Sequence, residues 1–180
     1  MWVFIQTHII SGLVPGIIFG LIASLIFALF LLLIKPKVKV ASKIARTNRD
    51  NGVSIIRVKV VNHTWAMLTN IKYALYYCNV HDDGISTVVE IPPRKSPMSY
   101  IARHNSSDDD ADYAVRFSYE LDNQKYPVGG NKKLLFIFIA DHSFSNTTVC
   151  IKKEYYDSDI IDGIYQIGDS TKIISNHPES

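Results

Sequence analysis

The amino-acid sequence predicts a mainly β protein, an antiparallel immunoglobulin-like β-sandwich preceded by one N-terminal transmembrane helix. Residues 9–34 are almost wholly apolar, as membrane-spanning segments are. After them, about eight or nine short segments alternate apolar and polar residues, which is the period of a half-buried strand. Turn residues separate these segments, and no amphipathic helix pattern interrupts them, as expected of a two-sheet sandwich.

The N-terminal segment has the length of a membrane span. No Asp, Glu, Lys or Arg occurs before Lys35, and the apolar run 9–34 contains 26 residues. Roughly 20 helical residues cross the hydrocarbon core. A cleaved signal peptide does not fit, because it would have a basic start and an apolar core of about 7–15 residues. Residues 1–8 are then a short flank, and residues 35–172 form the domain that follows.

The charges beside this segment predict its orientation. No Lys or Arg precedes it, and six follow within fifteen positions with no acidic residue among them: Lys35, Lys37, Lys39, Lys43, Arg46 and Arg49. Basic residues near a span stay on the cytoplasmic side, where they also lie favourably against anionic headgroups. We therefore expect a single-pass protein of the inner cell membrane, with its N-terminus outside and a cytoplasmic β-sandwich.

Small residues recur at every fourth position of the span: Gly12, Gly16, Gly20, Ser24 and Ala28. Such a stripe lets a second helix approach closely, and packing is what drives helix association in lipid. The stripe predicts a homo-oligomer formed through the transmembrane helix. Pro15 lies near the outer end, where a lost backbone hydrogen bond costs least.

The first strand patterns follow the span directly. Residues 37–40 alternate lysine and valine after Pro36, and residues 46–52 have turn chemistry with a hairpin signal at Asn51-Gly52. In 53–62, three apolar side chains are expected on one face (Ile56, Val58 and Val60), and two basic side chains on the opposite face (Arg57 and Lys59).

The remaining patterns complete the sandwich. In 70–80, one face collects Ile71, Tyr73, Leu75 and Tyr77. The run 134–142 is apolar enough to be a central strand covered on both faces. The other expected strands are 86–93, 98–103, 112–120, 147–156 and 163–168. Residues 173–180 are expected to be a frayed tail.

Composition excludes nucleic acid as the expected partner. The chain has 19 Lys and Arg against 17 Asp and Glu, and its basic excess is concentrated beside the span, which indicates lipid. Cys78 and Cys150 lie in apolar strand patterns and are expected to be buried free thiols in a cytoplasmic domain; in the reverse orientation they could pair.

No catalytic, cofactor or metal-binding residues are predicted. The acidic run Asp108, Asp109, Asp110 and Asp112 lacks the spacing of a calcium loop. Cys78, His81, Asp82 and Asp83 have no second ligand pair for zinc. The neighbours Asp141, His142 and Ser143 would alternate across a strand and could not converge as a triad.

Several segments carry a resemblance to known proteins. IKPKVKVASKIA, VKVVNHTWAMLTNIKYALYY and IADHSFSN…KEYYDSDIIDG resemble segments of small uncharacterised bacterial single-pass membrane proteins. The same pieces are distantly similar to the cytoplasmic immunoglobulin-like domain of inward-rectifier potassium channels. The likeness implies the fold, an internal sandwich and self-assembly. It implies no ion conduction, since the second membrane helix and the Thr-Val-Gly-Tyr-Gly filter are missing.

These observations favour a non-enzymatic protein whose β-sandwich is an interaction or assembly module for an unknown protein partner or for itself. A partner strand added to an exposed sheet edge is one expected mode. The alternative is an oligomerising membrane effector or channel-like subunit whose β-domain senses a ligand. A membrane-anchored enzyme is a third reading.

Overall fold

The computed structural model describes residues 2–34, 36–48, 53–81, 86–96 and 98–174. The chain divides into two compact units, Met1–Lys35 and Pro36–Ser180. The first contains one helix, and the second, called the β-domain below, contains all the described strands. The prediction of a mainly β protein with one N-terminal apolar helix is confirmed.

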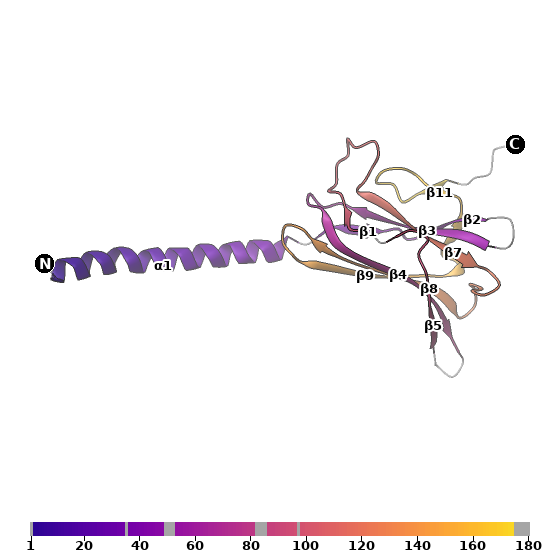
Figure 1. Ribbon diagram of the computed structural model, residues 1–180, viewed down its shortest axis with the longest axis horizontal. Coiled ribbons are helices and arrows are strands. Elements are labelled where there is room, and N and C mark those ends of the chain that lie inside the picture. Colours follow the sequence, from indigo (N-terminus) through magenta and orange to yellow (C-terminus); the bar gives the residue numbers. More distant parts are fainter. Residues whose placement is uncertain (1, 35, 49–52, 82–85, 97, 175–180) are drawn as a thin grey trace. The chain divides into compact units, whose positions relative to one another are not determined.

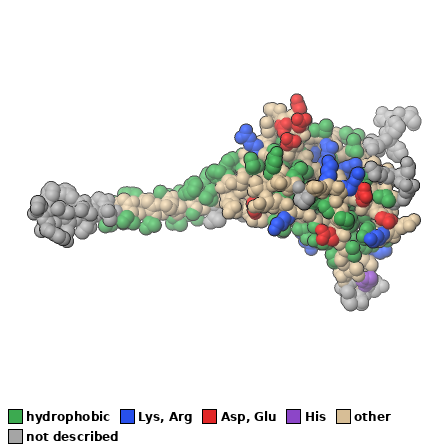
Figure 2. Space-filling model, in the orientation of Figure 1, with side chains coloured by type: hydrophobic (Ala, Val, Ile, Leu, Met, Phe, Trp, Pro, Cys, Tyr) green, Lys and Arg blue, Asp and Glu red, His purple; other side chains and the backbone are tan. Residues whose placement is uncertain are grey.

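Helix α1 extends from Trp2 to Leu33 and so begins before the predicted stretch 9–34. Its 32 residues would measure about 48 Å, against roughly 30 Å for a hydrocarbon core. Within it, Val14–Leu31 is long and apolar enough to cross a membrane, and none of these residues is buried. Figure 2 shows hydrophobic side chains along this stretch. A helix of a soluble domain would bury an apolar face.

The β-domain contains two five-stranded sheets and a small two-stranded sheet (Figure 1). In sheet A, β3 is central. Strand β7 pairs with one side of β3, and β1 and β2 both pair with the other side, β1 near the end of β3 and β2 near its start. Only the pairing of β10 with β2 is parallel among the described pairs of this sheet. The strands of sheet A are β1 (Val38–Val40), β2 (Ile44–Asn48), β3 (Val53–Asn62), β7 (Ala114–Asp122) and β10 (Ile160–Asp162).

Sheet B has the strand order β5-β4-β8-β9, with the short β6 beside the start of β4. The apolar strand β8 has a neighbour on each side, as its sequence predicts. The strands of sheet B are β4 (Leu68–Val80), β5 (Ser86–Ile91), β6 (Tyr100–Ile101), β8 (Lys132–His142) and β9 (Thr148–Tyr155).

The two sheets share one hydrophobic core. The ring of Phe117 in β7 lies 5.9 Å from that of Phe136 and 6.0 Å from that of Phe138, both in β8 of the other sheet. The faces predicted by alternation point into this core: Ile56, Val58 and Val60 from β3, and Ile71, Leu75 and Tyr77 from β4, with Tyr73 packed at the margin.

The outer face of sheet A is covered by residues 163–174, called the C-terminal cover. It follows a 3-10 turn (Asp157–Asp159) and contains β11 (Ile164–Tyr165) and β12 (Ile173–Ile174). Tyr165 packs against Ala41, which lies between β1 and β2, and against Ala45 of β2, and its hydroxyl donates to the carbonyl of Lys43. Residue 173 was expected in a frayed tail but pairs within this cover.

Lys59 lies on the face of β3 opposite Val58 and Val60, as predicted, and the C-terminal cover buries it there, since this residue is 0% exposed. Its ammonium donates to the carbonyl oxygens of Gln166, Gly168 and Ser170 at 2.7, 2.5 and 2.7 Å. Alternation correctly separates Lys59 from Val58 and Val60. It carries no information about a distant segment that covers the other face.

Three further predictions have different outcomes: one is wrong, one is confirmed in part, and one is not tested. Residues 46–48, predicted to belong to a turn, end strand β2. Cys78 is buried as expected, whereas Cys150 is exposed, and both are free thiols. The predicted hairpin signal Asn51-Gly52 lies outside the described residues.

Candidate functional site

The predicted small-residue stripe lies on α1, with Gly12 in a part whose side chains are not described. A Cβ atom at Gly16 or Gly20 would meet nothing within 4 Å. Ser24 and Ala28 are exposed, and the Ser24 hydroxyl donates to the carbonyl of Gly20 at 2.8 Å. The stripe is thus an open helix surface, and the hydroxyl of Ser24 is satisfied within its own helix.

The predicted basic flank separates into two groups. Exposed lysines lie at the start of the β-domain: Lys37, Lys39 and Lys43. Arg46 instead forms a 2.7 Å ion pair with Asp162, which joins β2 to β10. Lys35 and Arg49 lie outside the described residues. Among the described members, only the lysines remain available to a membrane surface.

Sheet B has two edges of different character, β5 and β9. Five of the six residues of β5 are exposed, and Val88 and Val89 on its opposite faces are 53% and 37% exposed. The strand contains neither Lys nor Pro, the residues that commonly protect an edge. Strand β9 carries Lys152 and Lys153, so it has the protection that β5 lacks.

An exposed apolar cluster of Trp65, Met67 and Phe144 lies at one end of the β-domain. The rings of Trp65 and Phe144 are 4.6 Å apart, and both side chains are about half exposed. The backbone N–H of the neighbouring His63 donates to the carbonyl of Lys37 at 2.8 Å. The cluster therefore lies at the end of the β-domain where the chain arrives from α1.

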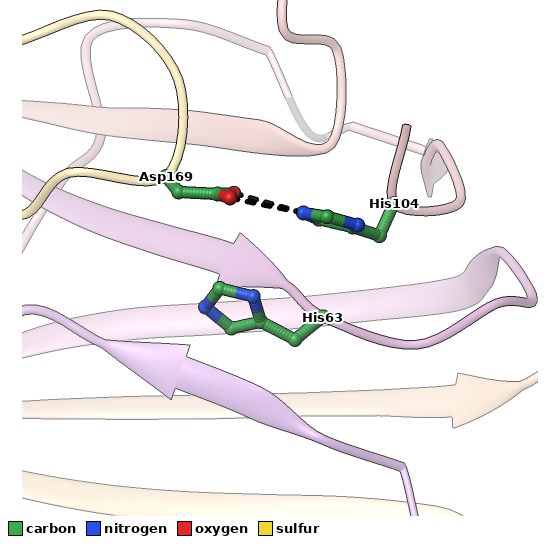
Figure 3. A group of neighbouring side chains, drawn as sticks. All are labelled: His63, His104 and Asp169. Carbon is green, nitrogen blue, oxygen red and sulfur yellow. Dashed lines mark hydrogen bonds and ion pairs between the residues drawn. The ribbon is translucent and has the colours of Figure 1, made fainter. Parts of the chain in front are cut away.

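Three potential metal ligands meet near this end: His63 after β3, His104 after β6, and Asp169 in the C-terminal cover (Figure 3). Nε2 of His104 is 3.0 and 3.1 Å from the two carboxylate oxygens of Asp169. One ligand atom of each residue lies within 4.8 Å of the other two. The His63 ring is 5.5 Å from that of His104 and has no hydrogen bond to a described residue.

A buried polar residue, Asn62, positions the two histidines. Its amide nitrogen donates to the carbonyls of Ala66 and Ala102 at 3.0 and 2.8 Å. The carbonyl of Thr64 accepts the backbone N–H of His104 at 2.9 Å. The loop that holds His63 and the segment that holds His104 are thereby joined.

Asp169 is positioned by two further contacts. The ammonium of Lys59 binds the carbonyls of both neighbours of Asp169, residues 168 and 170. The Tyr113 side chain lies beside Asp169, and burial together with the negative charge of Asp169 raises the pKa of Tyr113. The ring of Tyr113 also packs edge-on against His104.

Where the structure describes them, the other candidate groups of the sequence form hydrogen bonds with neighbouring residues. The Asp141 carboxylate accepts hydrogen bonds from Thr148 and Asn70, which lower its pKa, while His142 bonds to Ser145. The Asp108 carboxylate accepts backbone N–H groups of its own loop. His81 bonds to Thr87, and Asp82 and Asp83 lie outside the described residues.

Sequence reasoning missed the cluster of His63, His104 and Asp169. The intervals between these residues match no metal-binding motif, and the three segments meet only because the C-terminal cover folds over sheet A. A weak signal was present, since His63 and His104 each directly follow a strand pattern.

Known proteins do not assign this site: no family model matches the chain, and no curated protein matches its sequence. The fold places the chain in a structural class, that of a mainly β domain preceded by one apolar helix.

Proposed function

We propose that the chain is a single-pass membrane protein whose β-domain is a non-catalytic module for protein interaction or assembly. The N-terminus lies outside the inner cell membrane and the β-domain is cytoplasmic. The observation that carries this proposal is the unprotected edge β5, because an exposed strand edge can pair with a strand of another chain.

The membrane part of the proposal is supported by α1 and by the start of the β-domain. The exposed lysines Lys37, Lys39 and Lys43 follow an apolar helix long enough to span. Trp65 and Phe144 lie at the same end of the β-domain as Lys37. Aromatic side chains are typical of surfaces at the membrane interface.

The strand order supports an immunoglobulin-like sandwich. Sheet A places β1 and β2, then β3, then β7 side by side, and sheet B has the order β5-β4-β8-β9. Immunoglobulin domains place strands A, B, E and D in one sheet and C, F and G in the other, and the variable type adds C′ beside C. After β5 the chain crosses to sheet A, where Pro93 bridges Tyr119. The likeness to small bacterial single-pass proteins and to channel cytoplasmic domains stays a prediction.

The partner that we propose for β5 is a second copy of the chain. Anchoring in one membrane raises the effective concentration of copies, and the stripe on α1 provides a second contact. A two-fold antiparallel pair centred on Val88 places Glu90 opposite Ser86 of the second copy, so like charges do not meet.

The test is the molecular mass of the full chain in nanodiscs, measured by light scattering. Val88→Lys brings two ammonium groups together at the centre of the pair and is expected to lower the mass to that of a monomer. Cys150→Lys, an exposed position on the protected edge β9, is the matched control and should leave the oligomer intact.

Other outcomes separate the parts of the proposal. Dissociation by Gly16→Leu alone would assign assembly to the helix and contradict a role for β5. A monomeric wild type would contradict self-assembly. Protease protection tests the orientation, and a β-domain resistant to protease on the cytosolic side would contradict it.

A further inference from the structure

We propose that His63, His104 and Asp169 bind one divalent transition-metal ion, with Zn²⁺ as the ion that fits best. The three side chains come from segments far apart in sequence and present one ligand atom each within 4.8 Å. This inference is independent of the β5 edge, which belongs to a different sheet.

The donor set selects the class of ion. Two imidazoles and a carboxylate are ordinary zinc ligands, whereas Mg²⁺ and Ca²⁺ are bound almost wholly by oxygen. Three protein ligands leave one coordination position for water or for a group from another molecule. The site would therefore be an open zinc site at the end of the β-domain that bears Lys37.

The surroundings of the ligands resemble those of a metal site. Residues around a metal site hold its ligands in place, and the ring of Tyr113 packs edge-on against His104, with ring centroids 4.7 Å apart. The backbones that carry the ligands are fixed by Asn62 and by the buried ammonium of Lys59. Binding would thus require little ordering of the chain.

For the ion to enter, the ring of His63 has to rotate, whereas His104 and Asp169 have only to separate slightly. Ligand atoms on a tetrahedral zinc ion are about 3.4 Å apart, given bonds of about 2.0–2.1 Å. His104 and Asp169 are already closer than this, at 3.0 Å. His63 has no described hydrogen bond to lose when its ring rotates towards them.

The alternative to a zinc site is a simple ion pair between His104 and Asp169. The two explanations differ in whether they require His63 and zinc. An exposed pair is stabilised without His63 and is indifferent to zinc. A zinc site needs all three residues and would connect the β3–β4 loop, the segment after β6 and the C-terminal cover. Metal binding should then stabilise the folded β-domain by mass action.

The experiment uses the full chain in nanodiscs, without a polyhistidine tag and after treatment with a chelator. ZnCl₂ at a hundred times its dissociation constant should raise the thermal midpoint of the β-domain by roughly 5–10 °C, and MgCl₂ should not. Calorimetric titration should give one Zn²⁺ per chain, and Co²⁺ should give the visible absorption of a four-coordinate site.

His63→Ala is the decisive variant, because it leaves the pair of His104 and Asp169 intact. It should keep the metal-free midpoint of the wild type and lose at least tenfold in zinc affinity. His81→Ala is the matched control, since this exposed histidine lies away from the cluster and bonds to Thr87. Absence of zinc binding by the wild type, or equal binding by His63→Ala, would overturn the proposal.

Discussion

A β-sandwich leaves the outer faces and the edges of its sheets open to solvent. In this chain the outer face of sheet A is covered, whereas the edge of sheet B at β5 is exposed. On sheet A, the C-terminal cover buries Tyr165 and binds the ammonium of Lys59. On sheet B, β5 leaves Val88 and Val89 in solvent with no segment of the described chain paired to their outer side.

The two surfaces differ in the contacts that they make. The covered face adds polar contacts that hold distant segments together, and the cluster of His63, His104 and Asp169 forms at its margin. The bare edge contributes little to stability and keeps backbone groups available to another chain. Substitutions on the cover should therefore change stability, and substitutions on the edge should change association.

The largest effect is expected at Lys59. Lys59→Met at pH 7 removes the donor from three carbonyl groups and should lower the free energy of unfolding by about 3 kcal/mol. Burial lowers the pKa of Lys59 to about 8, so the side chain is still an ammonium at this pH. Urea unfolding followed by the fluorescence of Trp65 measures the change.

The control for this prediction is Lys39→Met, at an exposed lysine of β1. It should alter the free energy of unfolding by less than about 0.5 kcal/mol. Equal losses in the two variants would mean that the cover does not depend on the buried ammonium.

The next effect is expected at Gly163, where the cover begins. Its φ of +146° suits glycine alone, and an added Cβ would lie 2.2 Å from the carbonyl oxygen of Ile174. Gly163→Ala should therefore cost about 2 kcal/mol, measured by the same urea unfolding. Gly130→Ala, at a positive φ with open space around it, should cost only about 1 kcal/mol. A larger loss at Gly130 would contradict the close packing of the cover.

A smaller effect on stability is expected at the bare edge. Val88 is already exposed, so Val88→Lys should change the free energy of unfolding by less than about 0.5 kcal/mol, although it should abolish the proposed association through β5. Unfolding is measured at a dilution where the wild type is monomeric. A loss of stability comparable with that of Lys59→Met would show that β5 is part of the folded core. It would then contradict the difference between the covered face of sheet A and the exposed edge at β5.

The smallest effect concerns the buried end of β8, away from both surfaces. Burial lowers the pKa of His142 below its ordinary 6.5, and its Nε2 has no hydrogen-bond partner in the described structure. As the pH falls through 6.5, the unfolded chain takes up a proton that the folded chain does not, so stability decreases. Urea midpoints at pH 7.5 and 5.5 measure this slope, and His142→Gln should reduce it. An unchanged slope would exclude His142 as its source.

Much of the fold followed from local pattern. Alternation identified the inward faces of β3 and β4, and the apolar run at 134–142 identified a strand with neighbours on both sides. Alternation placed Lys59 on the right face of β3 and carried no information about its burial, because the segment that covers it is more than a hundred residues away in the sequence.

The candidate sites divide in the same way. The stripe on α1 and the basic flank are properties of consecutive residues and were visible in the sequence, although the pairing of Arg46 with Asp162 was not. The unprotected edge is a property of pairing, since the same six residues of β5 would be protected in the middle of a sheet.

The sequence by itself determined the apolar helix, the mainly β class and most strand faces, because hydrophobic period is a local consequence of backbone geometry. The tertiary structure alone decided which face is covered, which edge is bare, and that His63, His104 and Asp169 meet. These depend on contacts between distant segments, and the 3.0 Å approach of Asp169 to His104 is decided only when the C-terminal cover folds back over sheet A.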